Sequence, residues 1–356
     1  MSPRMPAVWT DRHRLHAPGF GVWLGVAIPG DEEPERGDAL REALDASGFD
    51  RHEATAHGDE PVLAVHRPEM VEFLSRAHRD WVVAGHLDDP GQPLVVPYVF
   101  ALPQVTSGRR CPRPAAIRAE VGTYAMDTMT PIGPGTYAAA RAAADCALTA
   151  ADLVLQGAPA AYAAVRPPGH HAGRDFYGGS CYLNNAAIAA QHLCDNGAGR
   201  VAIIDIDAHH GNGTQEIFWD RGDVWFGSVH VDPGAGWFPH FAGFADERGA
   251  GAGAGATRNA VLAPGAGDDE WVPAVRALAD EALGGRPDVV VVSLGVDAAE
   301  SDPESPLRVT LSGYLAAGAA LAGIGVRTVF VQEGGYDVAA LGALVLAVLD
   351  GYESGS

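Results

Sequence analysis

Residues 201–214, VAIIDIDAHHGNGT, contain the side chains best suited to hold a metal ion. The stretch begins as an apolar run and ends in two acids, two histidines and a glycine turn. Because side chains alternate between the two faces of a strand, we expect Asp205, Asp207 and His209 to point the same way. Charged groups buried at a strand end are costly unless a metal or a partner compensates them. This spacing therefore predicts half of a metal site, with a solvated acidic turn as the alternative.

A third ligand should come from another strand end, and Asp297 in SLGVDAAESDP (293–303) is best placed to provide it. Two carboxylates and one imidazole leave a coordination position open for water, which is typical of a catalytic zinc site. A bound zinc ion lowers the pKa of water to about 7 and polarises a carbonyl group. Ferrous iron can use the same ligands. The alternative role for Asp297 is to cap a helix.

Two adjacent histidines, His170 and His171, follow two prolines and a glycine in RPPGHH (166–171). The prolines restrict the backbone and the glycine permits a tight turn, so we expect both imidazoles to be held rigidly. One of them can remove a proton from metal-bound water. Asp205 and Asn212 are the candidate partners that set their tautomers. A histidine pair that only fills the surface or the core is the alternative.

Tyr336 stands on a glycine-rich turn, EGGYD (333–337). Its hydroxyl could reach the oxygen of a tetrahedral intermediate, where loss of one such donor typically costs about 100- to 1,000-fold in rate. A tyrosine that only packs is the alternative. A metal-activated water, two imidazoles and a phenol together predict an amide-hydrolysing site. No GxSxG elbow, GxGxxG turn or Walker motif competes, and the chain has no lysine, which excludes Schiff-base chemistry.

Apolar runs that read as strands precede these residues, at 160–165, 201–206, 224–229, 289–294 and 326–331. Helical stretches lie between most of the runs, notably at 184–194 and 272–283. This alternation predicts an α/β fold with a mostly parallel sheet and helices on both faces. Ligands bind beyond the carboxyl ends of the strands in such sheets. Because the reactive residues follow those ends, we expect the active site there.

The first part of the chain is less regular. Residues 8–10 could form a strand, residues 38–47, 67–84 and 136–156 have helical spacing, and residues 121–135 resemble an ordered loop. Residues 85–118 are rich in proline and glycine, which break regular elements. We interpret this segment as a covering loop near the site entrance and as an oligomer contact, with disorder as the alternative. We expect one catalytic domain over residues 1–356.

The composition limits the choice of partners and compartment. The net charge of −21 disfavours nucleic acid and anionic membranes and favours cationic partners. The four cysteines form no CxxC pair, so neither a zinc knuckle nor a disulfide framework is indicated. The apolar stretch 19–28 is too short for a signal peptide, and we expect no apolar span of 18 residues after it. The expected compartment is the cytoplasm.

Several motifs together resemble one family. RPPGHHAG (166–173), GGSCYLNNAAIAA (178–190), DIDAHHGNGTQEIF (205–218), SLGVDAAESDP (293–303) and EGGYD (333–337) resemble the arginase–deacetylase fold, and more narrowly the histone deacetylase superfamily. PIGPGTYAAA (131–140) and HVDPGAGWFPHFAGFADERGAGAG (230–253) are similar to bacterial acetylpolyamine amidohydrolases within it. The resemblance runs over most of the chain from about residue 60 onward.

The resemblance implies roles for individual residues. Zinc would be bound by Asp207, His209 and Asp297. His171, hydrogen-bonded to Asn212, would be the general base. His170, paired with Asp205, would be its electrostatic partner. Tyr336 would polarise the acetyl carbonyl, and the Gly179 carbonyl would receive the substrate amide N–H. A structural potassium ion is implied near the following residues: Asp205, Asp207, His209, Ser228 and Val229.

The sequence departs from the family pattern in two places. Ser180 stands where the family usually has an aromatic wall of the acyl tunnel, although Phe238 could supply the opposite wall. Acetylpolyamine amidohydrolases also tend to carry an acid before Gly122 to read the distal amine, and here Arg118 occupies that position, with Glu120 two residues on. A wider tunnel would accept a bulkier acyl group or a different amine.

The leading hypothesis is a zinc-dependent amidohydrolase that removes an acetyl or other short acyl group from a small amine, with acetylated polyamines first and protein acyl-lysine second. A possible homodimer would form through residues 85–118. An arginase-like two-manganese enzyme is disfavoured, because it needs more bridging carboxylates than DxDxHHGN offers. A binding or sensor protein without turnover is the remaining hypothesis.

Overall fold

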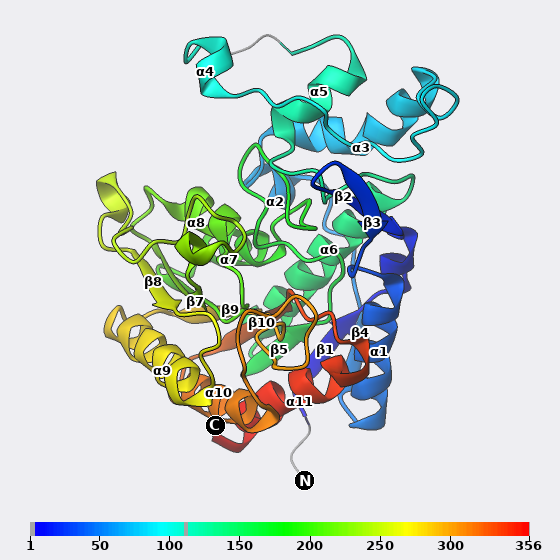
Figure 1. Ribbon diagram of the computed structural model, residues 1–356. Helices are drawn as coiled ribbons and strands as arrows, with labels where there is room; N and C mark the ends of the chain where they lie inside the picture. Colours follow the sequence, from blue (N-terminus) through cyan, green and yellow to red (C-terminus); the bar gives the residue numbers. More distant parts are fainter. Residues whose placement is uncertain (1–3, 110–112, 356) are drawn as a thin grey trace.

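The computed structural model describes residues 4–109 and 113–355, and an eight-stranded sheet forms its centre (Figure 1). The strand order is β4-β1-β5-β10-β9-β6-β7-β8, and every neighbouring pair runs parallel. The strands are β1 (Pro6–Trp9), β4 (Asp50–Glu53), β5 (Ala160–Ala163), β6 (Val201–Asp205), β7 (Val224–Val231), β8 (Thr257–Leu262), β9 (Val289–Leu294) and β10 (Thr328–Gln332). The predicted α/β fold with a mostly parallel sheet is confirmed.

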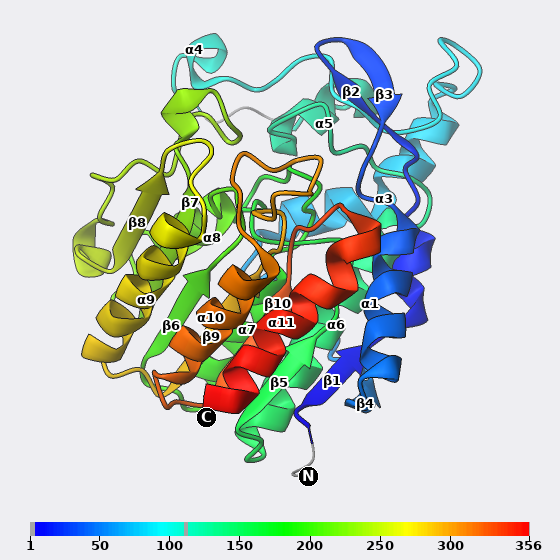
Figure 2. The same ribbon diagram turned by 60° about the horizontal axis from the view of Figure 1, so that its bottom comes forward.

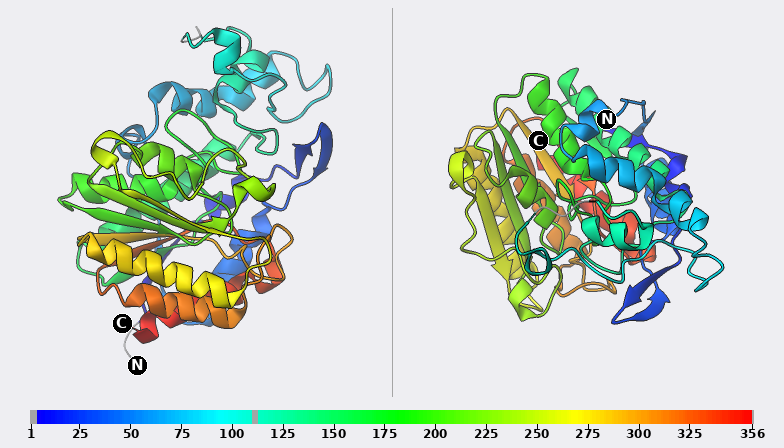
Figure 3. Two further views of the ribbon diagram at one scale, coloured as in Figure 1. Left: turned by 60° about the vertical axis from the view of Figure 1, so that its left-hand side comes forward. Right: turned by 90° about the horizontal axis from the view of Figure 1, so that it is seen from above.

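Alternate side chains of the central strands enter two separate cores. On β9, Val289 and Val291 belong to one core, whereas Val290 and Val292 belong to the other. The first core is covered mainly by α3 (Pro68–Val83), α6 (Thr136–Leu155) and α7 (Asn185–Asp195), and the second by α1 (Pro34–Ala46), α9 (Asp268–Gly284), α10 (Leu311–Ala322) and α11 (Val338–Gly355). Figure 2 shows the second group side by side over one face, and Figure 3 shows the sheet between helical layers. Burial on both faces explains why β9 reads VVVVSL without polar alternation.

The sequence reading missed several short elements. An antiparallel hairpin, β2 (Phe20–Trp23) and β3 (Val26–Pro29), stands apart from the main sheet. The edge strand β4 reads DRHE, so it has no apolar alternation to reveal it. The expected loop at 121–135 is partly wrong, because α5 (Ile117–Tyr124) extends into it. The remaining helices are α2 (Glu60–Leu63), α4 (Pro103–Thr106) and α8 (Asn212–Phe218).

Residues 85–118 contain α4 and the start of α5 and are otherwise irregular, with 110–112 outside the described residues. In Figure 2, α4 and the β2–β3 hairpin lie at the end of the molecule where the loops after the strands gather. The segment therefore stands on the same side as the predicted site, in line with a covering role.

The C-terminal helix α11 corrects one expectation. It has 18 residues and a mean hydropathy of 1.4, so the prediction that no apolar span of that length follows was wrong. Half of this span is buried, and α11 packs along α10 and α1 in the second core. Such burial is typical of a core helix.

Close packing of α10 on α11 depends on small residues. A Cβ added at Gly318 would lie 2.0 Å from the backbone oxygen of Val348, whereas a Cβ at Gly284 in α9 would meet nothing within 4 Å. Both glycines are helical, so alanine should improve helix propensity at both positions.

We predict opposite effects of the two alanine substitutions on stability. Gly318→Ala should lower the free energy of unfolding by about 1–3 kcal/mol, because the helices must separate to admit the methyl group. Gly284→Ala should raise it by up to about 1 kcal/mol. Denaturant unfolding of both variants measures the difference, and equal effects would contradict the close approach.

Candidate active site

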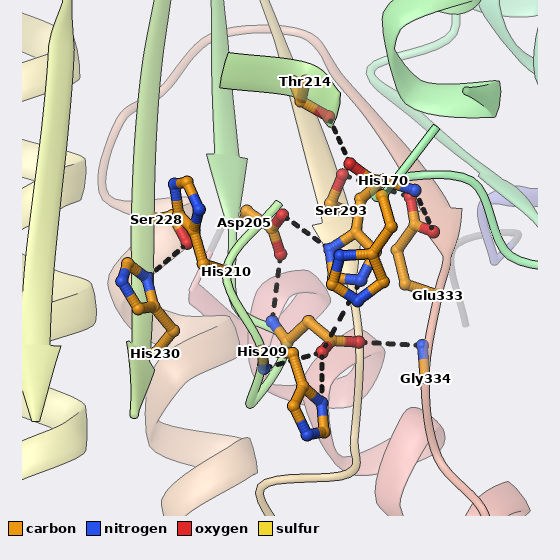
Figure 4. Close-up of polar contacts among 12 residues, drawn as sticks. His170, Asp205, His209, His210, Thr214, Ser228, His230, Ser293, Glu333 and Gly334 are labelled. Atoms are coloured by element: carbon orange, nitrogen blue, oxygen red, sulfur yellow. Dashed lines mark hydrogen bonds and ion pairs between the residues drawn. The ribbon is translucent and has the colours of Figure 1, made fainter. Parts of the chain in front are cut away.

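The three predicted metal ligands come together at the ends of two neighbouring strands. β6 and β9 pair in parallel with Asp205 opposite Ser293, so the loops that follow them begin side by side. The Nδ1 atom of His209 lies 3.0 Å from Asp297 Oδ2 and 3.4 Å from Asp207 Oδ1. One ligand atom from each of the three residues lies within 4.8 Å of the others. Figure 4 shows His209 pointing away from the strands, below His170.

Strand alternation does not explain this convergence, because β6 ends at Asp205. Backbone N–H groups orient the two acids instead. Asp207 Oδ2 accepts the N–H of Gly334 at 2.9 Å, and Asp297 Oδ1 accepts the N–H of Ala208 at 2.8 Å. Asp297 is no helix cap, since the next helix, α10, is capped by Thr310. The chain folds back on itself so that the carboxylates of two loops face one imidazole.

The charges of the three ligands are unbalanced. The side chains of Asp207 and Asp297 are each 1% exposed, and the nearest imidazole to both is that of His209, with His170 Nε2 3.8 Å from Asp207 Oδ1. Burial, reinforced by the charge of Asp207, raises the pKa of Asp297 to about 7. Two buried carboxylates with one imidazole are costly without a cation. This donor set suits a divalent ion such as zinc, with room for a further ligand.

A second buried group of possible ligand atoms, His170, Cys181 and Glu333, lies nearby. Burial raises the pKa of the Cys181 thiol well above its ordinary value, so the thiol stays protonated. One Glu333 oxygen, Oε2, already accepts the N–H groups of Gly169 and His170, at 2.6 and 3.1 Å. We interpret this group as support for the histidine turn.

Both histidines of the turn have the predicted partners. His170 Nδ1 lies 2.9 Å from Asp205 Oδ2, and His171 Nδ1 lies 2.7 Å from Asn212 Oδ1. The two rings are 4.0 Å apart between centroids. Because the oxygen of Asn212 can only accept, the Nδ1 atom of His171 carries hydrogen, and Nε2 of the neutral ring is left as a base.

Neighbouring charges separate the two imidazoles. Burial would lower the pKa of His170, but the carboxylates of Asp207 and Asp205 raise it to about 10. For His171, burial and the charge of His170 both lower the pKa, to well below its ordinary value. Divergent pKa values in a pair of titratable groups are the usual basis of acid and base roles. The geometry therefore offers a cationic His170 beside a neutral His171.

The turn that carries Tyr336 is fixed by two residues that sequence reasoning missed. The guanidinium group of Arg36 lies 4.6 Å from the Tyr336 ring centroid and donates to the carbonyl oxygens of Gly335 and Glu333, at 2.6 and 2.7 Å. Asp302 accepts the backbone N–H of Tyr336 at 2.6 Å. Asp302 lies inside the motif SLGVDAAESDP, so the sequence already placed it in the same loop as Asp297. No local sequence pattern marks Arg36.

Arg36 is itself held in a buried ion-pair network. Glu32 Oε1 lies 2.8 Å from Arg36 Nη1 and 2.7 Å from Arg166 Nε. The cations outweigh the effect of burial and lower the pKa of Glu32 to about 2. Arg166 is the first residue of RPPGHH, so the network ties the start of the histidine turn to the tyrosine turn.

Three of the predicted substrate-binding residues lie beside His171. A Cβ at Gly179 would lie 2.3 Å from the His171 ring and 2.9 Å from the Phe238 ring, and the φ angle of Gly179 is +55°. The Phe238 ring meets His171 edge-on at 4.8 Å. Ser180 also has a positive φ angle, of 63°, and its N–H donates to Thr130. Gly179, Ser180 and Phe238 thus frame one side of the base.

The structure does not bring Arg118 and Glu120 to this place. Both line a separate cavity of about 270 Å³, whose other walls come from α3 and from residues 83–86 and 115–117. Glu120 is 3% exposed and forms ion pairs with Arg76 and Arg113. Its carboxylate therefore joins α5 to α3, and the acid expected to read a distal amine is engaged elsewhere.

Three of the residues implied for potassium lie on adjacent strands, and Asp207 and His209 follow the end of β6. Asp205 at the end of β6 is opposite Ser228 on β7, with Val229 next in line. Ser228 Oγ lies 2.8 Å from His230 Nδ1 (Figure 4). His230 Nε2 lies 2.8 Å from the Gly243 carbonyl oxygen. Burial lowers the pKa of His230 to about 4, so the ring is neutral and donates only through Nε2. The Ser228 hydroxyl must then donate to Nδ1, which leaves its lone pairs free.

Comparison with known proteins supports one family. The histone deacetylase domain matches residues 31–352. The chain is 43% identical over 350 residues to acetylpolyamine amidohydrolase 1 of Pseudomonas aeruginosa, covering 98% of this chain and 99% of the relative. It is 40% identical over 349 residues to acetylpolyamine amidohydrolase of Mycoplana ramosa, with coverage of 98% and 99%.

Solved structures agree with the sequence relatives. The crystal structure of acetylpolyamine aminohydrolase from Burkholderia pseudomallei superposes with a TM-score of 0.92 at 37% identity, over 99% of both chains. The HD domain of HDA15 superposes with a TM-score of 0.79 at 28% identity, over 98% of this chain and 88% of the other. The predicted arginase–deacetylase architecture is confirmed by these likenesses.

His66 provides a pH prediction for the frame around the histidine turn. Its Nδ1 atom donates to the Gly173 carbonyl at 2.8 Å, and its Nε2 atom accepts the N–H of Asn184 at 2.9 Å. Burial lowers the pKa of His66 to about 4, below the 6.5 of an unfolded histidine. The unfolded chain therefore binds more protons between these values, so stability should fall as the pH drops from 6.5 toward 4.

We predict that His66→Gln, which keeps a donor and an acceptor, weakens this dependence. The slope of unfolding free energy against pH should decrease by up to about 1.4 kcal/mol per pH unit, equivalent to one proton. Ser75→Ala, which changes an exposed side chain of α3 and removes no titratable group, serves as the control and should leave the slope unchanged. An unchanged slope in His66→Gln as well would contradict the neutral, buried state of His66.

Proposed function

The chain belongs to the histone deacetylase family, and we propose that it hydrolyses the amide bond of small acetylated amines, with acetylated polyamines as the first substrate class. Relatives at 40–43% identity over the whole chain bear the name acetylpolyamine amidohydrolase. The single observation that carries the proposal is the position of a neutral, Asn212-bound His171, whose ring centroid lies 6.4 Å from that of the metal ligand His209. A base beside a metal site is what metal-assisted amide hydrolysis requires.

Asp207, His209 and Asp297 would hold one zinc ion, or a ferrous ion in its place. The bound ion supplies Lewis acidity toward the substrate carbonyl and lowers the pKa of water. The ion would add a counter-charge for the two carboxylates beyond the imidazoles of His209 and His170. An arginase-like two-metal site is not favoured, because the second group of ligand atoms contains a protonated thiol, Cys181.

The side chains around the site perform the proton transfers. His171 Nε2 takes a proton from the attacking water as the new C–O bond forms at the acetyl carbon. The cation of His170 stabilises the negative charge that develops beside it. When the C–N bond breaks, His171 returns its proton to the leaving amine. The products are acetate and the free amine.

Tyr336 acts on the carbonyl oxygen of the substrate. Burial raises the pKa of its phenol well above the ordinary value, so the hydroxyl keeps its proton and can donate a hydrogen bond. Such a donor stabilises a tetrahedral intermediate more than the planar amide. The Gly179 carbonyl, next to His171 and Phe238, would accept the substrate amide N–H.

A structural potassium ion would be held by the residues at the ends of β6 and β7 and in the loop after β6: Asp205, Asp207, His209, Ser228 and Val229. The hydroxyl of Ser228 has lone pairs to offer, as argued above, and Asp205 lies opposite it in the sheet. Oxygen ligands of this kind suit a hard cation. Comparison of thermal midpoints in potassium chloride and in tetramethylammonium chloride tests this proposal, and equal midpoints would count against it.

A second copy of the chain is our proposed partner for the 85–118 segment. Several apolar side chains there are exposed, with Tyr98 at 72% and Val105 at 75%. Exposed apolar side chains grouped on one segment mark interaction surfaces.

The cytoplasm remains our proposed compartment, and cell fractionation tests it.

We predict that the substrate panel separates the candidate activities. N-acetylputrescine and N-acetylcadaverine should be turned over faster than an acetyl-lysine peptide. Tyr336→Phe should lower kcat about 100- to 1,000-fold, as loss of one carbonyl hydrogen bond does, with metal content unchanged. A preference for the peptide would favour protein deacetylation. Binding of acetylated amines without any turnover would favour a sensor and contradict the proposed function.

We predict that charge introduced into the 85–118 segment separates the copies. Val105→Glu should convert a dimer into monomers in sedimentation velocity experiments, because a buried unpaired charge is costly at an interface. Leu283→Glu, at a position 43% exposed on α9, is the matched control. A wild-type protein that sediments as a monomer would remove the proposal.

A further inference from the structure

We propose that Asp302 is a positioning residue for Tyr336: its carboxylate fixes the tyrosine turn against the loop that carries Asp297. Asp302 is 7% exposed and follows Asp297 by five residues in the same loop. Its Oδ2 atom accepts the N–H groups of Tyr336 and Asp337, at 2.6 and 3.1 Å. The inference rests on the proposed function, since it assigns how the phenol donor of that reaction is held.

The turn needs such a contact because its own sequence is permissive. Tyr336 follows two glycines, and Gly335 adopts a φ angle of +129°, a region that side chains rarely allow. Glycine gives the backbone this freedom at the cost of rigidity. A phenol on such a turn stays in place only if the surrounding protein holds the turn.

Two charged groups of opposite sign hold the backbone of the turn. Arg36 donates to the carbonyl oxygens that precede Tyr336, as described above, whereas Asp302 accepts the N–H groups at and after Tyr336. Hydrogen bonds to charged groups are roughly twice as strong as neutral ones. The peptide group between Gly335 and Tyr336 is therefore held by both Arg36 and Asp302, and the one between Tyr336 and Asp337 by Asp302.

Asp302 also joins the turn to the metal ligands. The backbone of its loop pairs with the tyrosine turn, because Val296 N–H donates to Gly334 O at 3.0 Å and Glu333 N–H donates to Leu294 O at 2.9 Å. The second oxygen of Asp302, Oδ1, accepts the N–H of Glu304 at 3.0 Å and so braces its own loop. One loop thus carries the ligand Asp297 at one end and the carboxylate that orients Tyr336 at the other.

A purely structural role is the competing account. Asp302 accepts the N–H groups of the two residues just before α11, and these contacts could serve only to start that helix. Asp337 already does this, since its Oδ1 atom accepts the N–H of Ala340 at 3.3 Å. The Asp302 bond to Tyr336 itself lies before the helix. The two accounts differ in whether loss of the carboxylate acts through the phenol.

The test combines Asp302→Ala with Tyr336→Phe in a double-mutant cycle on N-acetylputrescine. Asp302→Ala should lower kcat by up to about 100-fold, because a small displacement of a catalytic group has this effect, with KM changed less than about threefold and metal content unchanged. In the Tyr336→Phe background the same substitution should lower kcat by less than about threefold, because the phenol is already absent. Asp302→Asn, which keeps one acceptor, should recover part of the lost kcat.

Asp268→Ala is the matched control. Asp268 also uses a carboxylate oxygen to accept a backbone N–H at a helix start, that of Thr310 at 2.8 Å, but it does not contact the tyrosine turn. This variant should lose stability without a loss of kcat. If Asp302→Ala lowers kcat equally in both backgrounds, Asp302 is only structural and the inference is overturned.

Amide hydrogen exchange separates this inference from the proposed function. The amides of Tyr336 and Asp337 should exchange faster in Asp302→Ala than in the wild type, whether or not the wild type hydrolyses any acylated amine. Absence of turnover in the wild type would remove the proposed function alone. Unchanged exchange at both amides would overturn the role of Asp302 alone.

Discussion

Burial of Asp207 and Asp297 beside His209 is the constraint on which the rest of the structure depends. Two carboxylates removed from water, facing one His209, are costly unless a cation joins them. The two carboxylates come together at the edge where the parallel strands end, because the loops after β6 and β9 start side by side there. Backbone N–H groups from the loop after β6 and from the turn after β10 then orient the carboxylate oxygens.

The same buried charge acts on the histidine pair, and further buried charges hold the turns around it. The carboxylates raise the pKa of His170 to about 10, and the resulting cation helps to lower that of His171. The electrostatic potential of the carboxylates therefore leaves His170 protonated and, through its charge, His171 neutral. Around them, buried charges are paired rather than isolated: Glu32 with Arg36 and Arg166 on one side, and Asp302 with peptide N–H groups on the other. Each pair fixes a turn that would otherwise be flexible.

The sequence was informative where chemistry and periodicity coincide. Apolar runs such as 289–294 predicted the parallel sheet, and the polar residues that follow them predicted the ligands and the histidine pair. Strand alternation predicted that Asp207 and His209 lie together, and they do. The cause is different, because the strand ends at Asp205 and both residues lie in the loop after it. Arg36 acts across almost 300 residues of chain, so no local pattern could reveal it. The ion pairs of Glu120 could not be predicted, because its two arginine partners are brought to it by tertiary packing of α3 and the segment before α5. The short edge strand β4 has no apolar pattern at all.

The most direct test of the central claim is the metal stoichiometry of the purified chain after equilibrium dialysis against zinc, measured by elemental mass spectrometry. The account predicts one divalent ion per chain in the wild type and none retained when Asp297 is replaced by alanine. It predicts no loss when alanine replaces Asp232, a carboxylate whose Oδ1 atom accepts only the N–H of nearby Gly234 among the described residues. Two ions per chain, or equal retention in the Asp297 variant, would contradict the account.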